Sequence, residues 1–270
     1  MKYKLLISDF DGTLAPSGST EIDKDTISAI KEYEKAGGKF VICTGRPFTS
    51  LKKITDKYGL NGLAVTIQGA VIRDIKSGEA LIKRGLDTET AISVINEYRK
   101  ENFEHVLYLD DEMYYDKDGY FVELYQSILK VKGVKVDDLV ETVKNSKVPV
   151  SKLCVVCEPE KTTKYEEIFN ERFNGKGVIF NSGAKILIEA VNPLYTKGSA
   201  VKFLMDYYSL TPKEVMTVGD STNDVTLVKG EWHGVAVGDG KEMLKKVAKE
   251  ITVPLKDKPI KYLIEKYCLH

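Results

Sequence analysis

The sequence lacks the features that mark several large classes of protein. Lysine plus arginine number 40 and aspartate plus glutamate number 40, so the formal net charge is zero and no basic stripe indicates nucleic-acid binding. No apolar run approaches the roughly 20 residues of a membrane-spanning helix. Residues 1–4 lead directly into an apolar run, which leaves no room for a signal peptide. We therefore expect a cytoplasmic protein that binds neither nucleic acid nor membrane.

Cysteine is also scarce, with 4 residues in 270. This number is too small for a disulfide framework. Cys154 and Cys157 have the spacing of a zinc ligand pair, but they lie in an apolar, strand-like run and a second ligand pair is missing. Because residues three apart on a strand face opposite sides, we expect the two sulfurs to diverge.

The apolar content that is present, 43% of 270 residues, suffices for about two domains. Short apolar runs alternate with helical patterns at both ends of the chain. The runs lie at residues 5–7, 39–44, 63–67, 215–218, 235–237 and 251–253. This alternation predicts an α/β fold with a Rossmann-like parallel sheet and right-handed crossovers.

The pattern changes between residues 83 and 190, where strands are shorter and more polar. Two hairpins are predicted, one joining 106–109 to 113–115 and the other joining 177–180 to 185–188. Helices are predicted at 89–100, 137–144 and 161–172. Local strand pairs mixed with helices predict an α+β domain at 83–190, inserted into a parallel-sheet core formed by 1–82 and 191–270.

Two carboxylates, Asp9 and Asp11, follow the first apolar run. In open α/β sheets ligands bind beyond the carboxyl ends of the strands. Like charges this close repel each other, and a hard cation such as Mg²⁺ would offset the repulsion. One carboxylate would then be an ionised nucleophile and the other a general acid or base. Taken alone, the pair is more typical of an Asp-rich turn.

Two single residues mark the same expected edge of the sheet. Thr44 follows the second apolar run, where its hydroxyl either caps the next helix or holds a phosphate oxygen. Lys197 opens a predicted helix, where a cation opposes the helix dipole. It is either a solvated lysine or the counter-charge of an anion bound at that helix end.

A third acidic stretch follows the run at 215–218. Asp220 would complete the oxygen shell that begins with Asp9, and Asn223 and Asp224 would orient that shell from behind. A nucleophilic carboxylate, an acid or base, a metal site, a cation and a hydroxyl together suit phosphoryl transfer.

Four motifs, DFDGTL at 9–14, TGR at 44–46, KG at 197–198 and GDSTND at 219–224, resemble those of haloacid dehalogenase-superfamily phosphatases in order and spacing. The resemblance covers essentially the whole chain. The insertion resembles the type IIB cap of the Cof-type subfamily. Two segments depart from the family pattern: Gln68-Gly69-Ala70 replaces Asn-Gly-Ala, and 237–240 replaces Gly-Asn-Ala. Both departures concern substrate choice more than chemistry.

The resemblance implies a role for each motif residue. Asp9 attacks phosphorus and forms an aspartyl-phosphate, while Asp11 protonates the leaving oxygen and then activates water. The metal ligands are Asp9, the backbone carbonyl of Asp11 and Asp220, with Asn223 and Asp224 in support. Thr44, Gly45 and Lys197 hold the phosphoryl oxygens. Arg46 faces either the substrate or a surface ion pair.

These observations predict a Mg²⁺-dependent phosphatase of small phosphorylated metabolites, such as sugar phosphates or phosphoglycolate-like acids. The expected partner is a small-molecule phosphate ester, and the expected assembly is a monomer or homodimer. Two alternatives remain open: a sugar phosphomutase, and a non-catalytic phospho-switch similar to a response-regulator receiver.

Overall fold

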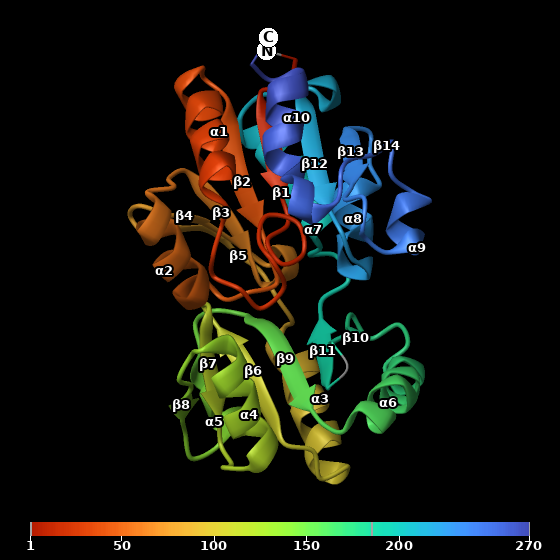
Figure 1. The fold of residues 1–270 in the computed structure, drawn as a ribbon. Helices are drawn as coiled ribbons and strands as arrows, with labels where there is room; N and C mark the ends of the chain where they lie inside the picture. The colour runs from red at the N-terminus through yellow and green to blue at the C-terminus, as the bar shows by residue number, and fades with distance from the viewer. Residues whose placement is uncertain (1, 185, 270) are drawn as a thin grey trace. The chain divides into compact units, whose positions relative to one another are not determined.

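The structure, a computed structural model, describes residues 2–184 and 186–269. Its contacts group the chain into two units, which Figure 1 colours along the sequence. The first unit comprises Met1–Gly45, Leu51–Leu81 and Thr196–His270, and the second comprises Arg46–Ser50 and Ile82–Tyr195. The predicted domain limits stay a prediction.

An eight-stranded sheet forms the centre of the first unit, in the order β14-β13-β12-β1-β2-β3-β4-β5. Its strands are β1 (Leu5–Ser8), β2 (Lys39–Cys43), β3 (Leu63–Thr66), β4 (Val71–Asp74), β5 (Ala80–Lys83), β12 (Val215–Gly219), β13 (His233–Ala236) and β14 (Glu250–Ile251). Strand β1 lies between β2 and β12 and is parallel to both, with Leu5 opposite Lys39 and Val215. The predicted α/β class with a parallel-sheet core is confirmed.

Two strands of this sheet, β4 and β5, were not predicted. Strand β4 is antiparallel to β3, and the two are joined by the short 3₁₀ turn η1 (Ile67–Gly69). The predicted third strand at 63–67 therefore ends at Thr66, because Ile67 already has a positive φ of 47°. A turn this short reverses the chain and forces antiparallel pairing, whereas parallel pairing needs a long crossover.

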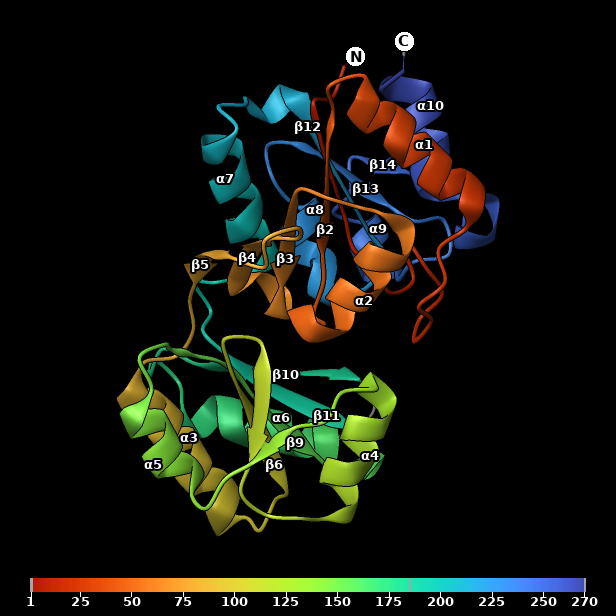
Figure 2. The ribbon, with the colours of Figure 1, turned by 90° about the vertical axis from the view of Figure 1, so that its left-hand side faces the viewer.

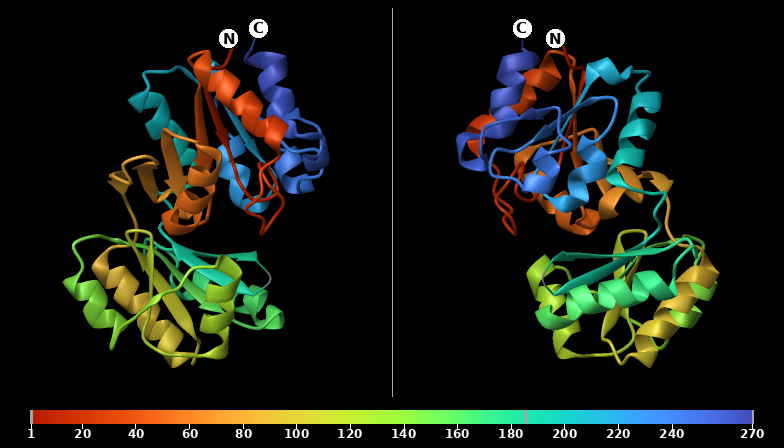
Figure 3. Two further views of the ribbon diagram at one scale, coloured as in Figure 1. Left: turned by 60° about the vertical axis from the view of Figure 1, so that its left-hand side comes forward. Right: turned by 90° about the vertical axis from the view of Figure 1, so that its right-hand side faces the viewer.

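Helices cover both faces of the sheet. They are α1 (Lys24–Lys35), α2 (Phe48–Tyr58), α7 (Lys197–Tyr207), α8 (Val225–Val228), α9 (Glu242–Lys245) and α10 (Pro259–Tyr267), with 3₁₀ turns η2 (Pro212–Glu214), η3 (Thr222–Asp224) and η4 (Leu255–Asp257). Helices α1 and α10 pack together on one face, and α7 lies on the other (Figures 2 and 3). Helix α1 illustrates the local cause: Asp23 caps it, and Ile27, Ile30 and Tyr33 form its buried stripe.

The second unit contains a six-stranded sheet in the order β10-β11-β9-β6-β7-β8. Its elements are α3 (Thr88–Lys100), β6 (His105–Leu109), β7 (Glu112–Tyr115), α4 (Tyr120–Leu129), β8 (Val134–Lys135), α5 (Leu139–Asn145), β9 (Val150–Val156), α6 (Pro159–Arg172), β10 (Ile179–Ala184) and β11 (Leu187–Val191). Tyr98, Phe169 and Phe180 pack in its own hydrophobic core. The first predicted hairpin and the three predicted helices are confirmed.

The second predicted hairpin was wrong in its turn. Strand β10 continues through the residues predicted to turn, and Asn181 pairs with Glu189. Side chains of α6 hold this extended backbone, because Glu166 accepts from the Ser182 N–H and Asn170 bonds to both backbone groups of Phe180. Lys185, in the predicted partner strand, lies outside the described residues.

The four cysteines are all free and buried. Cys157 lies in the hydrophobic core of the second unit, whereas the sulfur of Cys154 is 3.8 Å from the Tyr125 hydroxyl on the other face of β9. The predicted divergence of these two sulfurs is confirmed. None of the helices within residues 2–184 and 186–269 combines the length and apolar content needed to cross a membrane.

Candidate active site

Two neighbouring strands deliver the first acidic residues to one edge of the sheet. Residues 5–7 of β1 are fully buried, and the N–H of Asp9 continues the parallel ladder by donating to the Val218 carbonyl at 2.9 Å. Asp220 directly follows β12, the strand beside β1. Asp9 and Asp220 therefore lie at adjacent carboxyl ends, where open α/β sheets bind their ligands.

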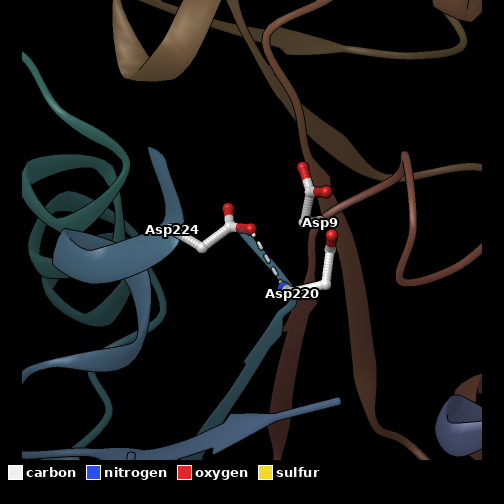
Figure 4. Close-up of side chains that lie close together, drawn as sticks. All are labelled: Asp9, Asp220 and Asp224. Atoms are coloured by element: carbon white, nitrogen blue, oxygen red, sulfur yellow. Dashed lines mark hydrogen bonds between the residues drawn. The ribbon is translucent and has the colours of Figure 1, made fainter. Parts of the chain in front are cut away.

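Asp9, Asp220 and Asp224 form one acidic cluster, shown in Figure 4. A carboxylate oxygen from each lies within 4.8 Å of the other two. Asp224, at the end of η3, is fully buried, and one of its oxygens accepts from the N–H groups of Asp220 and Ser221, both at 3.1 Å. These bonds hold the Asp224 carboxylate against the loop that carries Asp220.

Lys197 supplies the counter-charge to this cluster. Its Nζ lies 2.6 Å from Asp9 Oδ1 and 2.7 Å from Asp224 Oδ1, and its side chain is 1% exposed. The lysine is the first residue of α7, where Thr196 and Ser199 form a capping box that satisfies the helix end. These two ion pairs explain why a cation is found at a helix start, a position that the helix dipole disfavours.

Charges and burial oppose each other in this cluster. Burial, with the charge of Asp224, raises the pKa of Asp9 well above its usual range, while Lys197 acts in the opposite direction. Burial and Asp224 also raise the pKa of Asp220 to about 6. Burial by itself would lower the pKa of Lys197, but the charges of Asp224 and Asp9 outweigh it and raise this pKa. Lys197 is therefore charged. Its single positive charge does not balance the negative charges of the carboxylates around it.

This imbalance fits a metal ion. Lys197 pairs with the buried carboxylates of Asp9 and Asp224, and the partly exposed carboxylate of Asp220 lies beside them, so the cluster lacks a positive charge. All the candidate ligand atoms are carboxylate oxygens, which suit a hard divalent cation. Asp220 is oriented for such a role, since Oδ1 accepts from the hydroxyl of Thr13 at 2.8 Å. The residues present therefore fit a divalent metal site.

Asp11 lies outside the acidic cluster. Its Oδ1 accepts from the N–H of Gly18 at 2.9 Å, within the loop that follows β1. The chain turns at Gly12, whose φ is +86° and whose missing side chain leaves space for Asp220: a Cβ there would lie 2.5 Å from the Asp220 carboxylate. The glycine of this motif thus permits the close approach of the two acidic loops.

The remaining predicted residues occupy different surroundings. Thr44 is buried at the end of β2, and Gly45 follows it. Arg46 groups with the second unit, so its relation to the substrate stays a prediction. Asn223 is exposed, and its Nδ2 donates to Gln68 Oε1 at 3.3 Å, so this bond joins it to η1 and not to an acidic ligand.

Sequence reasoning missed a role for Thr13 and Gln68. Thr13 is fully buried and bonds to Asp220, which is 207 positions away. It stands inside the first motif, so its position was a signal that went unused. Gln68 was noted only as a departure from the family pattern, and nothing local indicated its partner Asn223.

Residues 6–264 match the haloacid dehalogenase-like hydrolase family. The chain belongs to this family. A 5-amino-6-(5-phospho-D-ribitylamino)uracil phosphatase of Bacillus subtilis is 26% identical over 97% of both chains. A solved Thermotoga maritima protein is 25% identical, with a TM-score of 0.86 over 99% of this chain and 100% of the other. A solved subclass IIB sugar phosphatase is 20% identical, with a TM-score of 0.82 over 99% and 100%. The predicted family and enzyme class, a phosphatase-type hydrolase, are confirmed.

Proposed function

We propose that this protein is a Mg²⁺-dependent phosphatase that hydrolyses small phosphorylated metabolites through an aspartyl-phosphate on Asp9. One observation carries the proposal: Asp9 directly follows a central strand, belongs to a cluster of three carboxylates of which two are buried, and is held by a buried lysine. A purely structural cluster of this kind would be costly, because buried charges destabilise a fold unless they are fully paired.

In the first step, an oxygen of Asp9 attacks phosphorus and the bond from phosphorus to the ester oxygen breaks. Asp11 gives its proton to the departing oxygen, which leaves as an alcohol. Lys197 holds Asp9 Oδ1 and so fixes the orientation of the nucleophilic carboxylate. The hydroxyl of Thr44 and the backbone at Gly45 are proposed to hold phosphoryl oxygens.

In the second step, Asp11 takes a proton from water, and the water oxygen attacks the phosphorus of the aspartyl-phosphate. The bond between Asp9 and phosphorus breaks, which releases inorganic phosphate and regenerates the carboxylate. Asp11 ends the cycle protonated, as it began. A single residue thus serves as acid and then as base, a cycle that general acid–base catalysis allows.

Asp9, the backbone carbonyl of Asp11 and Asp220 are proposed to hold Mg²⁺, while Asp224 and Asn223 support them. The ion would offset the excess negative charge of the cluster and of the phosphoryl group. Thr13 holds Asp220 in place, and the loop N–H groups hold Asp224.

The substrate class rests on the family and on the inserted unit. We propose that residues 83–190 act as a type IIB cap that limits the site to small esters and excludes water during the reaction. The relative named for a phosphorylated ribityl compound supports a phosphorylated sugar or sugar-like substrate. Phosphoglycolate-like acids belong to the same proposal. A cytoplasmic location and a monomeric or homodimeric state stay predictions.

The test is phosphate release from p-nitrophenyl phosphate and from a panel of phosphorylated sugars and acids, with Mg²⁺ and with EDTA. We expect Asp9→Asn and EDTA each to lower the rate by about 10³-fold or more, since each removes an essential part of the transition state. Lys202→Met, an exposed lysine on the same helix as Lys197, is the control.

Equal rates for Asp9→Asn and the parent protein contradict the mechanism. Accumulation of phosphorylated protein without turnover would support the phospho-switch instead. Dependence on a bisphosphate activator would support the phosphomutase.

A further inference from the structure

The turn η1, between β3 and β4, has an unusual backbone. Ile67, Gln68 and Gly69 have φ values of 47°, 57° and 110°, so three consecutive residues lie in the left-handed region. Glycine accepts this conformation, but a β-branched isoleucine is strongly disfavoured there. Such strain persists only where surrounding contacts impose it, and it gathers at functional sites.

Contacts with two parts of the candidate active site hold this turn. The N–H of Gln68 donates to the Thr44 carbonyl at 3.1 Å. On the other side, Gly69 packs so closely on the start of α7 that a Cβ would lie 2.3 Å from the Thr196 oxygen and 2.8 Å from the Lys197 nitrogen. The strained turn thus packs between Thr44, which is proposed to bind phosphate, and Lys197, which holds the nucleophile.

The side chain of Gln68 is oriented by the same surroundings. Its Oε1 accepts from Asn223 Nδ2 at 3.3 Å, in the loop that carries Asp220. This bond directs the other end of the carboxamide toward Gly45, where a Cβ would lie 2.5 Å from Gln68 Nε2. Gln68 therefore lies between two of the four motifs, TGR at 44–46 and GDSTND at 219–224, and its N–H₂ group is the end that faces the Thr44–Gly45 loop.

We propose that Gln68 is a substrate-binding residue, whose Nε2 donates a hydrogen bond to an oxygen of the phosphate ester held at Thr44 and Gly45. This inference rests on the proposed phosphatase function. The backbone strain is what brings a side chain from the β3–β4 turn to this loop, and Asn223 fixes which end of the amide faces it. A hydrogen-bond donor at this position favours a ligand that presents a negatively charged oxygen to it. It disfavours a ligand that presents only hydrogen-bond donors there.

The experiment compares two substitutions that separate binding from structure. Gln68→Glu keeps the length of the side chain and an oxygen that accepts from Asn223, but it replaces the donor by a negative charge. Gln68→Leu removes both hydrogen bonds and adds no charge. Asn61→Leu is the matched control, because Asn61 is an exposed amide whose Nδ2 donates within its own loop, to the Gly59 carbonyl.

The readouts are KM and kcat for the best ester of the panel and the dissociation constant of inorganic phosphate, measured by calorimetry with Mg²⁺. We expect Gln68→Leu to raise KM and the phosphate dissociation constant by about 10-fold with a small change in kcat, as the loss of a hydrogen bond to a charged group predicts. Gln68→Glu should raise both further, because its charge repels the ligand. Asn61→Leu should change neither.

A purely structural Gln68 gives a different pattern. If Gln68→Glu binds phosphate within twofold of the parent protein, the inference is overturned, since that variant keeps the bond to Asn223. The calorimetric arm does not depend on turnover. A parent protein that binds phosphate but releases none from any ester would therefore overturn the proposed function while still deciding the role of Gln68.

Discussion

At the scale of single residues, the hydroxyl of Thr13 shows how a buried neutral group can control an acidic one. Its bond to Asp220 Oδ1 lowers the pKa of Asp220, against the larger effects of burial and of Asp224. We predict that Thr13→Val, which keeps the shape and removes the bond, weakens Mg²⁺ binding by about 10- to 100-fold, as loss of a partner behind a metal ligand does. A Mg²⁺ titration of both proteins measures this.

The matched variant is Thr13→Ser, which keeps the hydroxyl and should bind Mg²⁺ nearly as tightly as the parent protein. If Thr13→Val and Thr13→Ser bind with the same affinity, the hydroxyl does not support the metal ligand. In that case the buried methyl group of Thr13, which is fully excluded from solvent, matters only for packing.

Placements that follow from strand ends could be predicted, and placements that depend on distant side-chain partners could not. Asp9 and Asp220 stand at the ends of apolar runs, and adjacent parallel strands bring such ends together by rule. Thr13 and Gln68 form hydrogen bonds with partners 207 and 155 positions away, which no local pattern encodes. Asp11 belongs with them, because the turn at Gly12 ends the extended geometry assumed for it.

At the scale of elements, the same limit applies to helix α4, which was not predicted. Its N-cap is Gly119, which offers no side chain, and the helix start is satisfied instead by Glu104, whose carboxylate accepts from the N–H groups of Phe121 and Val122. A cap supplied from 17 positions away leaves no signal at the helix start. Helix α1, with Asp23 directly before it, carries that signal.

The turn η1 leads to a prediction at this scale. Gly69→Ala places a Cβ against the Thr196 carbonyl at a position whose φ is +110°. We expect it to lower the free energy of unfolding by about 2 kcal/mol or more, since backbone strain and a clash add. It should also lower kcat, because the first turn of α7, which carries Lys197, must shift. Urea unfolding and phosphate release measure the two effects.

Gly37→Ala is the control for that experiment. Gly37 also has a positive φ, of +97°, but nothing lies within 4 Å of its added Cβ. Gly37→Ala should lower the free energy of unfolding by about 1 kcal/mol, which is the effect of placing an alanine in the left-handed conformation, and should leave kcat unchanged. If Gly69→Ala and Gly37→Ala lower the free energy of unfolding equally and have equal kcat values, the packing of η1 against α7 does not constrain the position of α7.

At the scale of the whole molecule, residues near the two ends of the chain contact each other in the first unit. Tyr3 stacks on His233 with ring centroids 5.3 Å apart, and the N–H of Lys2 donates to the Tyr267 carbonyl of α10. Glu250, on the edge strand β14, joins the same group: it bonds to His233 and Tyr267 at 2.9 Å and pairs with Lys266 at 3.1 Å. One carboxylate thus ties the edge of the sheet to the last helix.

This carboxylate makes stability depend on pH in a stated direction. Burial would raise the pKa of Glu250, but its bonds from His233, Lys266 and Tyr267 outweigh burial and lower it. A lowered pKa means that Glu250 stabilises the fold fully above its unfolded pKa of about 4.3 and loses this effect as pH falls through the folded value. We predict that Glu250→Gln lowers the free energy of unfolding by about 1 kcal/mol at pH 7. This difference in unfolding free energy from the parent protein should narrow between pH 5 and pH 3.

Urea unfolding of both proteins at pH 7, 5, 4 and 3 tests the prediction. The comparison below pH 5 is decisive, because the lowered pKa of Glu250 places the loss of its charge in that range. Glu265→Gln is the control: Glu265 lies on the same helix as Lys266, and its pair with Lys261 is half exposed, so its removal should cost little at any pH. A gap for Glu250→Gln that stays constant or widens from pH 5 to pH 3 would mean that the ends of the chain are held by ring packing and not by this charge.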